Sequence, residues 1–513
     1  MTKVSKYSLA PSVALYSAEQ IKKIEQRFAE ESPSGTYALM EKAGASAFHH
    51  LISTWPEARK IIVVTGKGNN AGDGFIVATL AAERRLKVDL VHLADPKLLK
   101  GDALLAYQKM PNRVIKVRSV KEVDFTGYDL IVDAMLGTGI KGKLQEPYVS
   151  VIKRINANQI PVLAIDIPTG VEANTGFVHN EAVRADLTVT FVANKKGMYT
   201  GDSANYRGRV ILSELDIPSH CYDQQTFHLF SKNWHSLKDK LKPREASCHK
   251  GKFGHTIVIG GYHGMSGAAV LASTAAARSG SGLTTAWVAD DCAKVIVSHT
   301  PEVMAKGIDT ESIHQQVESL IQSNATLVLG PGLGRTSWSK SWIDALSEND
   351  ELKKVNQVWD ADALNWLSEF SDSSPNLHNS HRILTPHPGE AARLLGTSID
   401  LVQQDRYKAA QSIANQFGGV CVLKGSGTII ADEHGFQVVC PVGNPGMASG
   451  GMGDVLAGLI GGLLAQGYSL MDAAMLGVCI HGEAADRATG SGKHYRGLLA
   501  SDLFEFFPHL LNP

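Results

Sequence analysis

Lys60-Ile-Ile-Val-Val-Thr-Gly-Lys-Gly-Asn-Asn-Ala-Gly-Asp-Gly-Phe75 is the stretch that indicates the fold most directly. Its β-branched run, Ile61–Thr65, predicts a buried strand, and the glycines after it predict a tight turn. The residues that follow have helical character. A strand, a glycine-rich turn and a helix in this order are typical of one unit of a parallel sheet whose ligand lies at the carboxyl ends of the strands.

The turn itself matches the dinucleotide fingerprint at Gly66-x-Gly68-x-x-Ala71, and Asp89 or Asp95 could supply the ribose-binding acid about 20 residues further on. A dehydrogenase loop needs small residues here, so that the backbone can approach pyrophosphate. This loop instead inserts the polar side chains Asn69, Asn70 and Asp73, which predicts a site with specific polar contacts.

Short β-branched runs alternate with helical segments along both halves of the chain, which predicts two α/β domains with parallel sheets. Two helices are expected before the first strand, over Ser17–Leu51 with a break at Ser32–Gly35. The predicted strands of the first half are Ile61–Thr65, Lys87–Leu93, Asp129–Asp133, Val162–Asp166 and Leu187–Phe191. Those of the second half are Thr256–Gly260, Thr285–Val288, Leu327–Gly330, Gln357–Asp360, Arg382–Thr385 and Val420–Lys424, followed by helices at Asp454–Gln466 and Met471–Thr489.

The length of 513 residues also requires more than one domain, because single cores stop growing at about 250–300 residues. The alternation is lost between about Leu215 and Lys252, where polar residues and Pro243 interrupt it. We therefore expect a Rossmann-like, three-layer α/β/α domain over residues 1–225 and a second α/β domain over residues 226–513.

The composition is that of an ordinary globular protein, with 44% hydrophobic and 20% charged residues. A formal net charge of -1 without long runs of like charge gives no reason to expect nucleic acid or a membrane surface as partner. The most apolar stretch, Val455–Ala465, is about half of the roughly 20 residues that span a bilayer, so a buried helix is expected there. Residues 1–17 lack the apolar core of a secretory signal, and the six cysteines lack C-x-x-C spacing. We expect a cytoplasmic protein.

Aspartates follow several of the predicted strands of the first half. Asp133 and Asp166 end two strands, and Asp73 lies in the loop after a third. Any one of them could be a helix cap or a turn residue. Three of them at one edge of a parallel sheet instead favour a site.

These loops carry a resemblance to a known family. Gly66-Lys-Gly-Asn-Asn-Ala-Gly-Asp-Gly74, Asp133-Ala-Met-Leu-Gly-Thr-Gly139 and Asp166-Ile-Pro-Thr-Gly170 are similar to the N-terminal domain of the bifunctional NAD(P)H-hydrate repair enzymes. The similarity covers roughly Ser17 to Asp216. Ala71 and Thr169 stand where the family usually has glycine and serine.

The resemblance implies an epimerase that interconverts the R and S hydrates of NADH and NADPH. It implies that Asp166 lies close to the reacting ring, where a carboxylate assists as acid, base or stabiliser of a cationic ring. It also implies a potassium ion near Asn70, Asp133 and Thr169. The residues implied to bind the hydrate are Asn69, Asn70, Ala71, Gly72, Asp73, Gly137, Thr138, Gly139, Ile140, Lys141, Gly142, Lys143 and Asp166.

The second half carries Gly443-Asn-Pro-Gly-Met-Ala-Ser-Gly-Gly-Met-Gly-Asp454, which leads into the most apolar helix of the chain. Glycines at a helix N-terminus leave backbone N–H groups free, and the helix dipole favours negative charge there. Asp454 could be a simple N-terminal acid. Gly450, Gly451 and Gly453 exceed what a cap needs, which favours an anion site.

This string is similar to the anion hole of ribokinase-like phosphotransferases, and in full to the C-terminal dehydratase of the same repair enzymes. The similarity runs from about Gly251 to the end of the chain. Further segments occur in the family's order: Ser266-Gly-Ala-Ala, Gly330-Pro-Gly-Leu-Gly334, Asp360-Ala-Asp-Ala-Leu-Asn365, Thr385-Pro-His-Pro-Gly-Glu390 and Lys424-Gly-Ser-Gly-Thr428.

This second resemblance implies that the S hydrate is dehydrated at the expense of ADP, because phosphorylation turns a poor leaving group into a good one. Asp454 is the implied base towards the hydroxyl, and magnesium accompanies ADP. The hydrate is implied to contact Ala268, Gly334, His387 and Asp454. The nucleotide is implied to contact Lys424, Gly425, Ser426, Gly427, Thr428 and Gly453. Relatives imply a homo-oligomer.

Other interpretations remain open at this point. His387 between two prolines could be structural, and Lys424 could be a solvated strand end. A ribokinase-like small-molecule kinase fused to a Rossmann-type binding domain would share the Asp454 chemistry but leave a phosphorylated product. A scaffold role for the first half conflicts with the presence of Asn70, Asp73, Asp133 and Asp166 together. A dehydrogenase lacks a hydride-transfer site beyond the glycine fingerprint.

Overall fold

The computed structural model describes residues 13–513 except 34, 112–114, 120–122, 224, 226–228, 324, 348, 371–376 and 491–493. The chain forms two compact units, one from Ala14 to Leu229 and one that holds Val13 and Phe230 to Pro513. The boundary predicted between residues 225 and 226 involves residue 226, which lies outside the described residues. So do most of the residues in which a secretory signal was sought.

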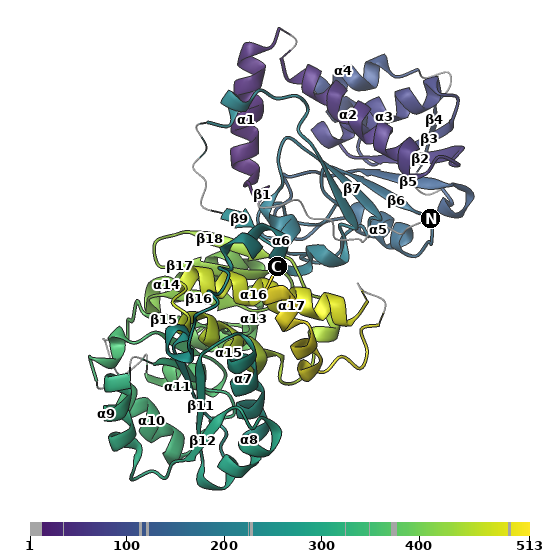
Figure 1. The fold of residues 1–513 in the computed structure, drawn as a ribbon. Coiled ribbons are helices and arrows are strands. Elements are labelled where there is room, and N and C mark those ends of the chain that lie inside the picture. Colours follow the sequence, from purple (N-terminus) through teal and green to yellow (C-terminus); the bar gives the residue numbers. More distant parts are fainter. Residues whose placement is uncertain are drawn as a thin grey trace. The chain divides into compact units, whose positions relative to one another are not determined.

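The first unit is built on a seven-stranded sheet in the order β4-β3-β2-β5-β6-β7-β8, in which all neighbouring strands are parallel (Figure 1). Its strands are β2 (Lys60–Thr65), β3 (Lys87–His92), β4 (Lys116–Arg118), β5 (Leu130–Ala134), β6 (Val162–Ile165), β7 (Leu187–Phe191) and β8 (Arg209–Ser213). Its helices are α1 (Ala18–Glu31), α2 (Gly35–Thr54), α3 (Asn69–Glu83), α4 (Gly101–Lys109) and α5 (Tyr148–Asn156).

Alternate residues of the central strand β2 face two separate cores. Ile61 and Val63 pack with the buried residues of α1 to α4, while Ile62 and Val64 pack with those of α5. Because successive side chains of a strand point to opposite faces, this division places helices on both sides of the sheet. The predicted three-layer α/β/α architecture is confirmed.

Two edge strands of this sheet were not predicted. All three residues of β4 are exposed, and β8 is at most half-buried. Edge strands lack the continuous apolar run that marks a strand buried on both faces, so the sequence pattern does not distinguish them from loops.

The second unit is built on a larger sheet in the order β18-β17-β16-β15-β14-β13-β10-β11-β12, extended at the β18 edge by β9 (Leu229–Ser231) and β1 (Val13–Ala14). Its other strands are β10 (His255–Ile259), β11 (Leu283–Val288), β12 (Met304–Gly307), β13 (Thr326–Leu329), β14 (Gln357–Trp359), β15 (Arg382–Leu384), β16 (Val420–Leu423), β17 (Thr428–Asp432) and β18 (Gln437–Cys440). The helices are α6 (Trp234–Leu237), α7 (Ser266–Arg278), α8 (Ala293–His299), α9 (Ile313–Ser323), α10 (Ser337–Ser347), α11 (Asp362–Phe370), α12 (Pro388–Leu394), α13 (Ile399–Gln404), α14 (Arg406–Phe417), α15 (Met452–Ala465), α16 (Leu470–Ala488) and α17 (Phe507–Leu511).

Helices cover both faces of this sheet as well. Ala286 and Val288 of β11 pack with α7 and α8, whereas the intervening Trp287 stacks on Trp342 of α10. The strands from β12 to β16 are parallel, as predicted, but β16, β17 and β18 pair antiparallel. The strands β17 and β18 were not predicted, and they are antiparallel because a short turn connects β16 to β17 and leaves no room for a crossover helix.

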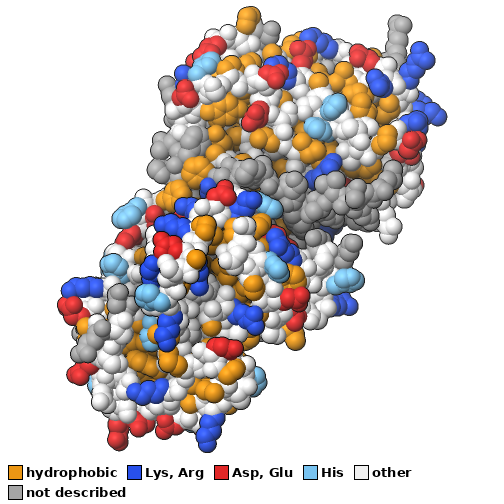
Figure 2. Space-filling view, in the orientation of Figure 1, with side chains coloured by type: hydrophobic (Ala, Val, Ile, Leu, Met, Phe, Trp, Pro, Cys, Tyr) orange, Lys and Arg blue, Asp and Glu red, His pale blue; other side chains and the backbone are white. Residues whose placement is uncertain are grey.

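The apolar helix α15 is buried along almost its whole length and begins at Met452, two residues before the predicted start. The left-handed backbone of Gly451, with a φ of 87°, ends the preceding loop and opens the helix. Of the described helices, none is long and apolar enough to cross a bilayer. Acidic and basic side chains are interspersed over the surface seen in Figure 2.

Candidate functional sites

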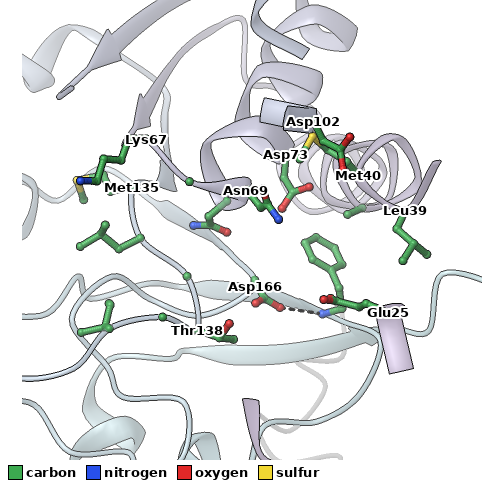
Figure 3. Close-up of a pocket in the computed structure, with 18 of the residues that line it drawn as sticks. Glu25, Leu39, Met40, Lys67, Asn69, Asp73, Asp102, Met135, Thr138 and Asp166 are labelled. Carbon is green, nitrogen blue, oxygen red and sulfur yellow. Dashed lines mark hydrogen bonds between the residues drawn. The ribbon is translucent and has the colours of Figure 1, made fainter. Parts of the chain in front are cut away.

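A cavity of about 600 Å³ opens in the first unit at the carboxyl ends of the parallel strands. The segments after β2, β5 and β6 contribute most of its wall, and α1, α2, Asp102 of α4, Phe191 and Leu215 supply the rest (Figure 3). The sequence-predicted residues that line it are Asn69, Asn70, Asp73, Gly137, Thr138, Gly139, Ile140, Lys141 and Asp166. The topology thus brings together polar residues that lie almost a hundred positions apart.

Four of the predicted hydrate-binding residues do not line this cavity. Ala71 is fully buried in the core, and a Cβ on Gly72 would lie 2.4 Å from the sulfur of Met40. Both positions therefore need small residues so that the helices can pack closely. Gly142 and Lys143 lie further along the loop, where Lys143 is exposed. Their assignment to the binding site stays a prediction.

Asp166 occupies a backbone conformation that side chains rarely adopt, with a φ of 67°, directly after β6. Its Oδ1 accepts a hydrogen bond from the backbone N–H of Phe191 at 3.2 Å and forms a short ion pair with the ammonium group of Lys195. Lys195 is almost fully buried, at 1% exposure, beneath the cavity wall. Strain of this kind persists only where the surrounding structure enforces it, and it is concentrated at functional sites.

Two further carboxyl groups face Asp166 across the cavity (Figure 3). Burial, and then the charge of Asp166, raise the pKa of Glu25 to about 7. Burial, together with Asp166 and Glu25, raises the pKa of Asp73 well above its ordinary value. The cavity therefore holds carboxyl groups that are protonated and ionised near neutral pH, which suits acid–base chemistry.

Glu25 and Lys195 were not predicted. Glu25 lies one helical turn after Ile21 and next to Ile24, so the periodicity places a carboxyl group on the buried face of α1, which was an available signal. Lys195 follows the end of β7 by four residues, and a lysine after a strand is normally solvated. A signal was available in the rule that ligands lie beyond the carboxyl ends of parallel strands, since β7 is one of these strands.

Asp133 and Thr169, the predicted potassium ligands, lie under the cavity floor. The Thr169 hydroxyl and backbone N–H both donate to the Asp133 carboxylate, at 2.7 and 2.8 Å. Asn70 lies against the loop that follows β5, since a Cβ on Gly137 would lie 3.4 Å from its Cβ. The amide oxygen of Asn70 is buried and has no hydrogen-bond partner among the described residues. A buried amide oxygen without a partner and a buried carboxylate are both oxygen ligands of the kind that a hard cation such as potassium prefers.

The second site lies at the N-terminus of α15. Asp454 is in the first turn, and burial, followed by the charge of Asp360, raises its pKa to about 7. Lys424 donates to Asp360 at 2.7 Å and lies 3.9 Å from Glu390. A Cβ on Gly453 would be 3.2 Å from the Lys424 ammonium nitrogen, so this glycine lets the lysine reach the helix end.

Lys424 is not a solvated strand end, because its side chain is only 19% exposed and sits among carboxylates. Burial opposes its charge, but Asp360 and Glu390 outweigh burial and hold its pKa above the usual value. Burial also raises the pKa of Glu390 to about 7. The structure thus concentrates negative charge around a single lysine, an arrangement suited to a bound cation and a phosphate chain.

His387 has a clear structural role. It caps α12, with Nδ1 accepting from the backbone N–H groups of Gly389 and Glu390 at 3.0 and 3.4 Å. Its Nε2 is 3.4 Å from the Glu390 carboxylate, which ties it to the charged group around Lys424. Burial, and then Lys424, lower the pKa of His387, so the neutral ring is favoured. A contact with the hydrate stays a prediction.

The remaining predicted positions divide between two loops. Gly334 has a φ of 73° and donates its N–H to Asp362 at 2.9 Å, and Ala268 lies in the first turn of α7. The loop Gly425–Thr428 follows β16, where Gly425 and Gly427 both have positive φ and Thr428 bonds back to Gly425 at 3.1 Å. A second cavity, of about 720 Å³, includes Ser449 and Arg496 beside the glycine-rich turn before α15.

Two acids considered for ribose binding have other roles. Asp89 accepts hydrogen bonds from Tyr128 and Arg118 at 2.6 and 3.3 Å, and Asp95 caps a short 3-10 helix, Pro96–Leu98. Neither lines the cavity. The fingerprint reading of these two acids is therefore wrong.

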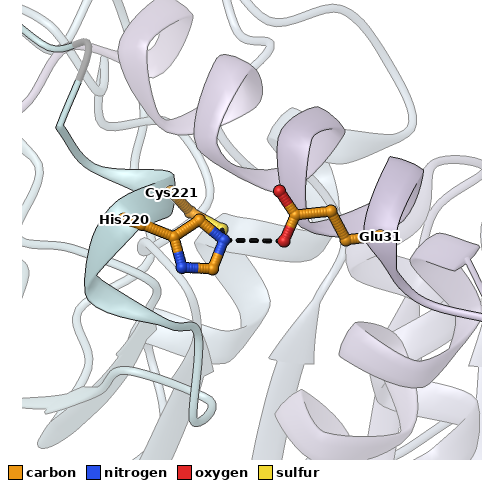
Figure 4. A group of neighbouring side chains, drawn as sticks. All are labelled: Glu31, His220 and Cys221. Atoms are coloured by element: carbon orange, nitrogen blue, oxygen red, sulfur yellow. Dashed lines mark hydrogen bonds and ion pairs between the residues drawn. The ribbon is translucent and has the colours of Figure 1, made fainter.

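Elsewhere in the first unit, Glu31 contacts His220 at 2.6 Å with Cys221 beside it (Figure 4). This contact joins the last residue of α1 to the 3-10 helix η5 (Ser219–Cys221). It holds the helix that carries Glu25 in place at its C-terminal end.

Comparisons with known proteins agree with these two sites. The family model for NAD(P)H-hydrate dehydratase matches residues 256–509, and that for the YjeF-related protein N-terminus matches residues 36–197. The bifunctional NAD(P)H-hydrate repair enzyme Nnr of Coxiella burnetii is 42% identical over 97% of this chain and 99% of its own length. That of Escherichia coli is 38% identical over 97% of this chain and 93% of its own length.

A solved structure supports the fold of the second unit. A ribokinase-like superfamily protein from Enterococcus faecalis superimposes with a TM-score of 0.50 and 26% identity, covering 56% of this chain and 98% of that one. The ribokinase-like fold predicted for this part is confirmed. Since both halves match and the full-length relatives span nearly the whole chain, this protein belongs to the family of bifunctional NAD(P)H-hydrate repair enzymes.

Proposed function

We propose that the first unit epimerises the R and S hydrates of NADH and NADPH, and that the second unit dehydrates the S hydrate at the expense of ADP, giving AMP, phosphate and the normal cofactor. The observation that carries this proposal is that one chain retains both charged sites: Asp166 with Lys195 in the first cavity, and Asp454 beside Lys424 at the N-terminus of α15.

In the first unit, hydration of an enamine places the hydroxyl on the carbon next to the ring nitrogen, so loss of that hydroxyl leaves a positively charged ring. Asp166 stabilises this charge from the cavity wall. Asn69 and the loop Gly137–Lys141 bind the nicotinamide part. Return of water to the other face of the ring then gives the other epimer.

Asn70, Asp133 and Thr169 would hold potassium in this unit. Bound there, the ion would neutralise the buried Asp133 and engage the orphaned amide oxygen of Asn70. Asn70 would then be held against the loop that contains Gly137. The potassium site would thus orient the part of the cavity wall that binds the substrate.

In the second unit, Asp454 accepts the proton of the hydrate's hydroxyl while a phosphoryl group passes from ADP to the oxygen. Free backbone N–H groups of the turn Ser449–Gly453 stabilise the transferring phosphoryl group. Lys424 and the turn Gly425–Thr428 bind the phosphates of ADP. The C–O bond then breaks with phosphate as the leaving group, and the dihydropyridine ring is restored as a ring proton is lost.

Magnesium accompanies ADP in this proposal, and its chemistry is to screen the phosphate charges. Asp360 and Glu390 have the oxygen ligands that magnesium prefers, and they share one lysine. That the protein works in the cytoplasm and as a homo-oligomer stays a prediction.

The test is recovery of absorbance at 340 nm from an R/S mixture of NADH hydrate with ADP and magnesium. We expect full recovery by the wild type, none by Asp454→Ala, and recovery of only the S portion by Asp166→Ala beyond spontaneous epimerisation. Asp400→Ala, which removes an exposed acid from the first turn of α13, should behave as the wild type. No ADP-dependent recovery by the wild type would overturn the proposal in favour of a kinase that leaves a phosphorylated product.

A further inference from the structure

The first cavity contains more acid than its single buried ammonium group can neutralise. Glu25 of α1, Asp73 of α3 and Asp166 after β6 all line it (Figure 3). The Lys195 ammonium donates to Asp166, to the Thr190 hydroxyl at 2.9 Å and to the Phe191 carbonyl at 2.9 Å. A lysine has three N–H donors, so all of them are used and none is left for Glu25 or Asp73.

The three acids are therefore not equivalent. Asp166 has the lysine and a backbone N–H to stabilise its negative charge. Glu25 has neither a hydrogen bond nor an ion pair with any residue that the structure describes. Like charges that share a site cannot all ionise, so the proton goes to an acid without a cationic partner. Burial and Asp166 raise the pKa of Glu25 to about 7, in agreement with this geometry.

The other charged groups around Glu25 do not change this assignment. Lys195, and then Lys22 on the same helix, act to lower the pKa of Glu25, but burial and Asp166 outweigh them. Three charged groups on neighbouring elements are paired: Lys42 of α2 with Asp216, Glu41 of α2 with Lys109, and His220 of η5 with Glu31. The cavity is also lined by Asp73 of α3, whose own pKa is raised, by Asp102 of α4, which accepts a hydrogen bond from Thr36, and by the exposed Lys67 and Lys141.

The position of Glu25 is fixed by the anchoring of α1 at both ends. At the N-terminus, Ser17 and Gln20 form a capping box, and the N–H of Ala18 donates to Asn174 at 2.8 Å. At the C-terminus, Glu31 contacts His220 (Figure 4). Between these points Ile21 and Ile24 are buried in the core, so the helix cannot rotate and Glu25 stays at the cavity.

We propose that Glu25 is a catalytic acid of the epimerase, which protonates the departing hydroxyl of the hydrate, and that Lys195 is a positioning residue that keeps Asp166 ionised. This inference rests on the epimerase function proposed above. It assigns different tasks to two carboxyl groups that line the same cavity.

The C–O bond at the hydrated carbon breaks, its electron pair leaves with oxygen, and the proton of Glu25 completes a water molecule. The ring nitrogen lone pair forms a C=N bond, and the resulting positive charge lies against Asp166. Water then adds to the opposite face, forming the new C–O bond, and its surplus proton returns to the carboxyl groups of the cavity. No oxidant or reductant is needed.

The test compares wild type, Glu25→Gln and Glu30→Gln for conversion of purified R hydrate to S hydrate, followed by chromatography between pH 5.5 and 8.5. Glu30 is exposed on the same helix, so Glu30→Gln makes the same change of charge and of helix-forming residue as Glu25→Gln, but away from the cavity. We expect Glu25→Gln to lower kcat/KM by about 100-fold or more, the usual contribution of a positioned acid, with Glu30→Gln unchanged. The wild-type rate should fall above about pH 7, where Glu25 loses its proton, and this decline should be absent in Glu25→Gln.

ADP-dependent dehydration of purified S hydrate by the same variants checks that the second unit is intact, and thermal unfolding checks the folding of the first unit. The dehydration rate should be equal in all three proteins. A Glu25→Gln rate within a factor of three of wild type, or an unchanged pH decline, would overturn the assignment of Glu25. If the wild type itself does not convert R to S hydrate, the proposed epimerase function fails instead, so the two failures are distinguishable.

Discussion

The raised pKa of Asp454 predicts how dehydration depends on pH. A base acts only when ionised, and the pKa of this carboxyl is raised from 3.8 to about 7 by burial and by Asp360. Below pH 7 the ionised fraction falls about tenfold for each pH unit, so the rate should fall with it down to about pH 5.5. An exposed aspartate with an ordinary pKa would leave the rate flat over this range.

The substitution Asp454→Asn should abolish this dependence along with the activity. It preserves the shape of the side chain but removes the base, for which a loss of about 10²- to 10⁴-fold is expected. This corresponds to about 3–5 kcal/mol of transition-state stabilisation. Dehydration is measured as the initial increase in absorbance at 340 nm with purified S hydrate, saturating ADP and magnesium, with a blank at each pH for acid decay of the product.

Asp400→Asn is the matched control, because it changes an exposed acid in the first turn of another helix. It should retain both the wild-type rate and the wild-type pH profile. A wild-type rate that is independent of pH between 5.5 and 7, or an Asp454→Asn variant within tenfold of wild type, would refute the reasoning that Asp454 is the base.

Three other predictions follow from the same structure. Asn70→Ala should raise the potassium concentration needed for half-maximal epimerisation by about tenfold or more, because metal sites lose affinity on this scale when a supporting group is removed. A titration with KCl at constant ionic strength tests this prediction, and an unchanged potassium dependence would exclude Asn70 as a ligand. Asp454→Asn should also stabilise the fold, because an acid whose pKa is raised in the folded state destabilises that state progressively between its unfolded pKa and about pH 7. The difference in Tm between this variant and the wild type should grow from pH 4 to 7 and then level off on the order of 5 °C. A Tm difference that is constant with pH would contradict this linkage. Gly458→Ala should lower the free energy of unfolding of the second unit by about 1–3 kcal/mol, since the new Cβ would lie 2.0 Å from the Ala272 carbonyl oxygen where α15 packs on α7. Denaturant unfolding measures this loss, and it should show none for Gly267→Ala, whose Cβ meets open space.

The sequence was most informative where a strand is buried on both faces. The central strands β2, β5, β6 and β7 were predicted to within a residue at each end, because their runs of β-branched residues have no competing interpretation. The edge strands β4, β8 and β12 were missed, and so was the antiparallel pair β17 and β18. Their pairing depends on contacts with neighbours that are distant in sequence, and no local pattern encodes these contacts.

The same division applies to the sites. The motifs around Asp166 and Asp454 identified both sites, because glycine turns and strand-end acids have a local signature. Glu25 and Lys195 have no such motif. Glu25 is a polar residue on the apolar face of a helix and Lys195 is a lysine after a strand, and each becomes part of a site only when α1 and β7 are packed against the loop that holds Asp166.

By itself, then, the sequence determined the two α/β halves, the family and the loops that are predicted to bind ligand, because strand periodicity, glycine turns and motif order are properties of short segments. Only the tertiary structure decided the charge state of the sites. A pKa depends on burial and on charges a few ångströms away, and those neighbours are brought together by the fold: Asp166 with Lys195 across 29 positions, and Lys424 with Asp360 across 64.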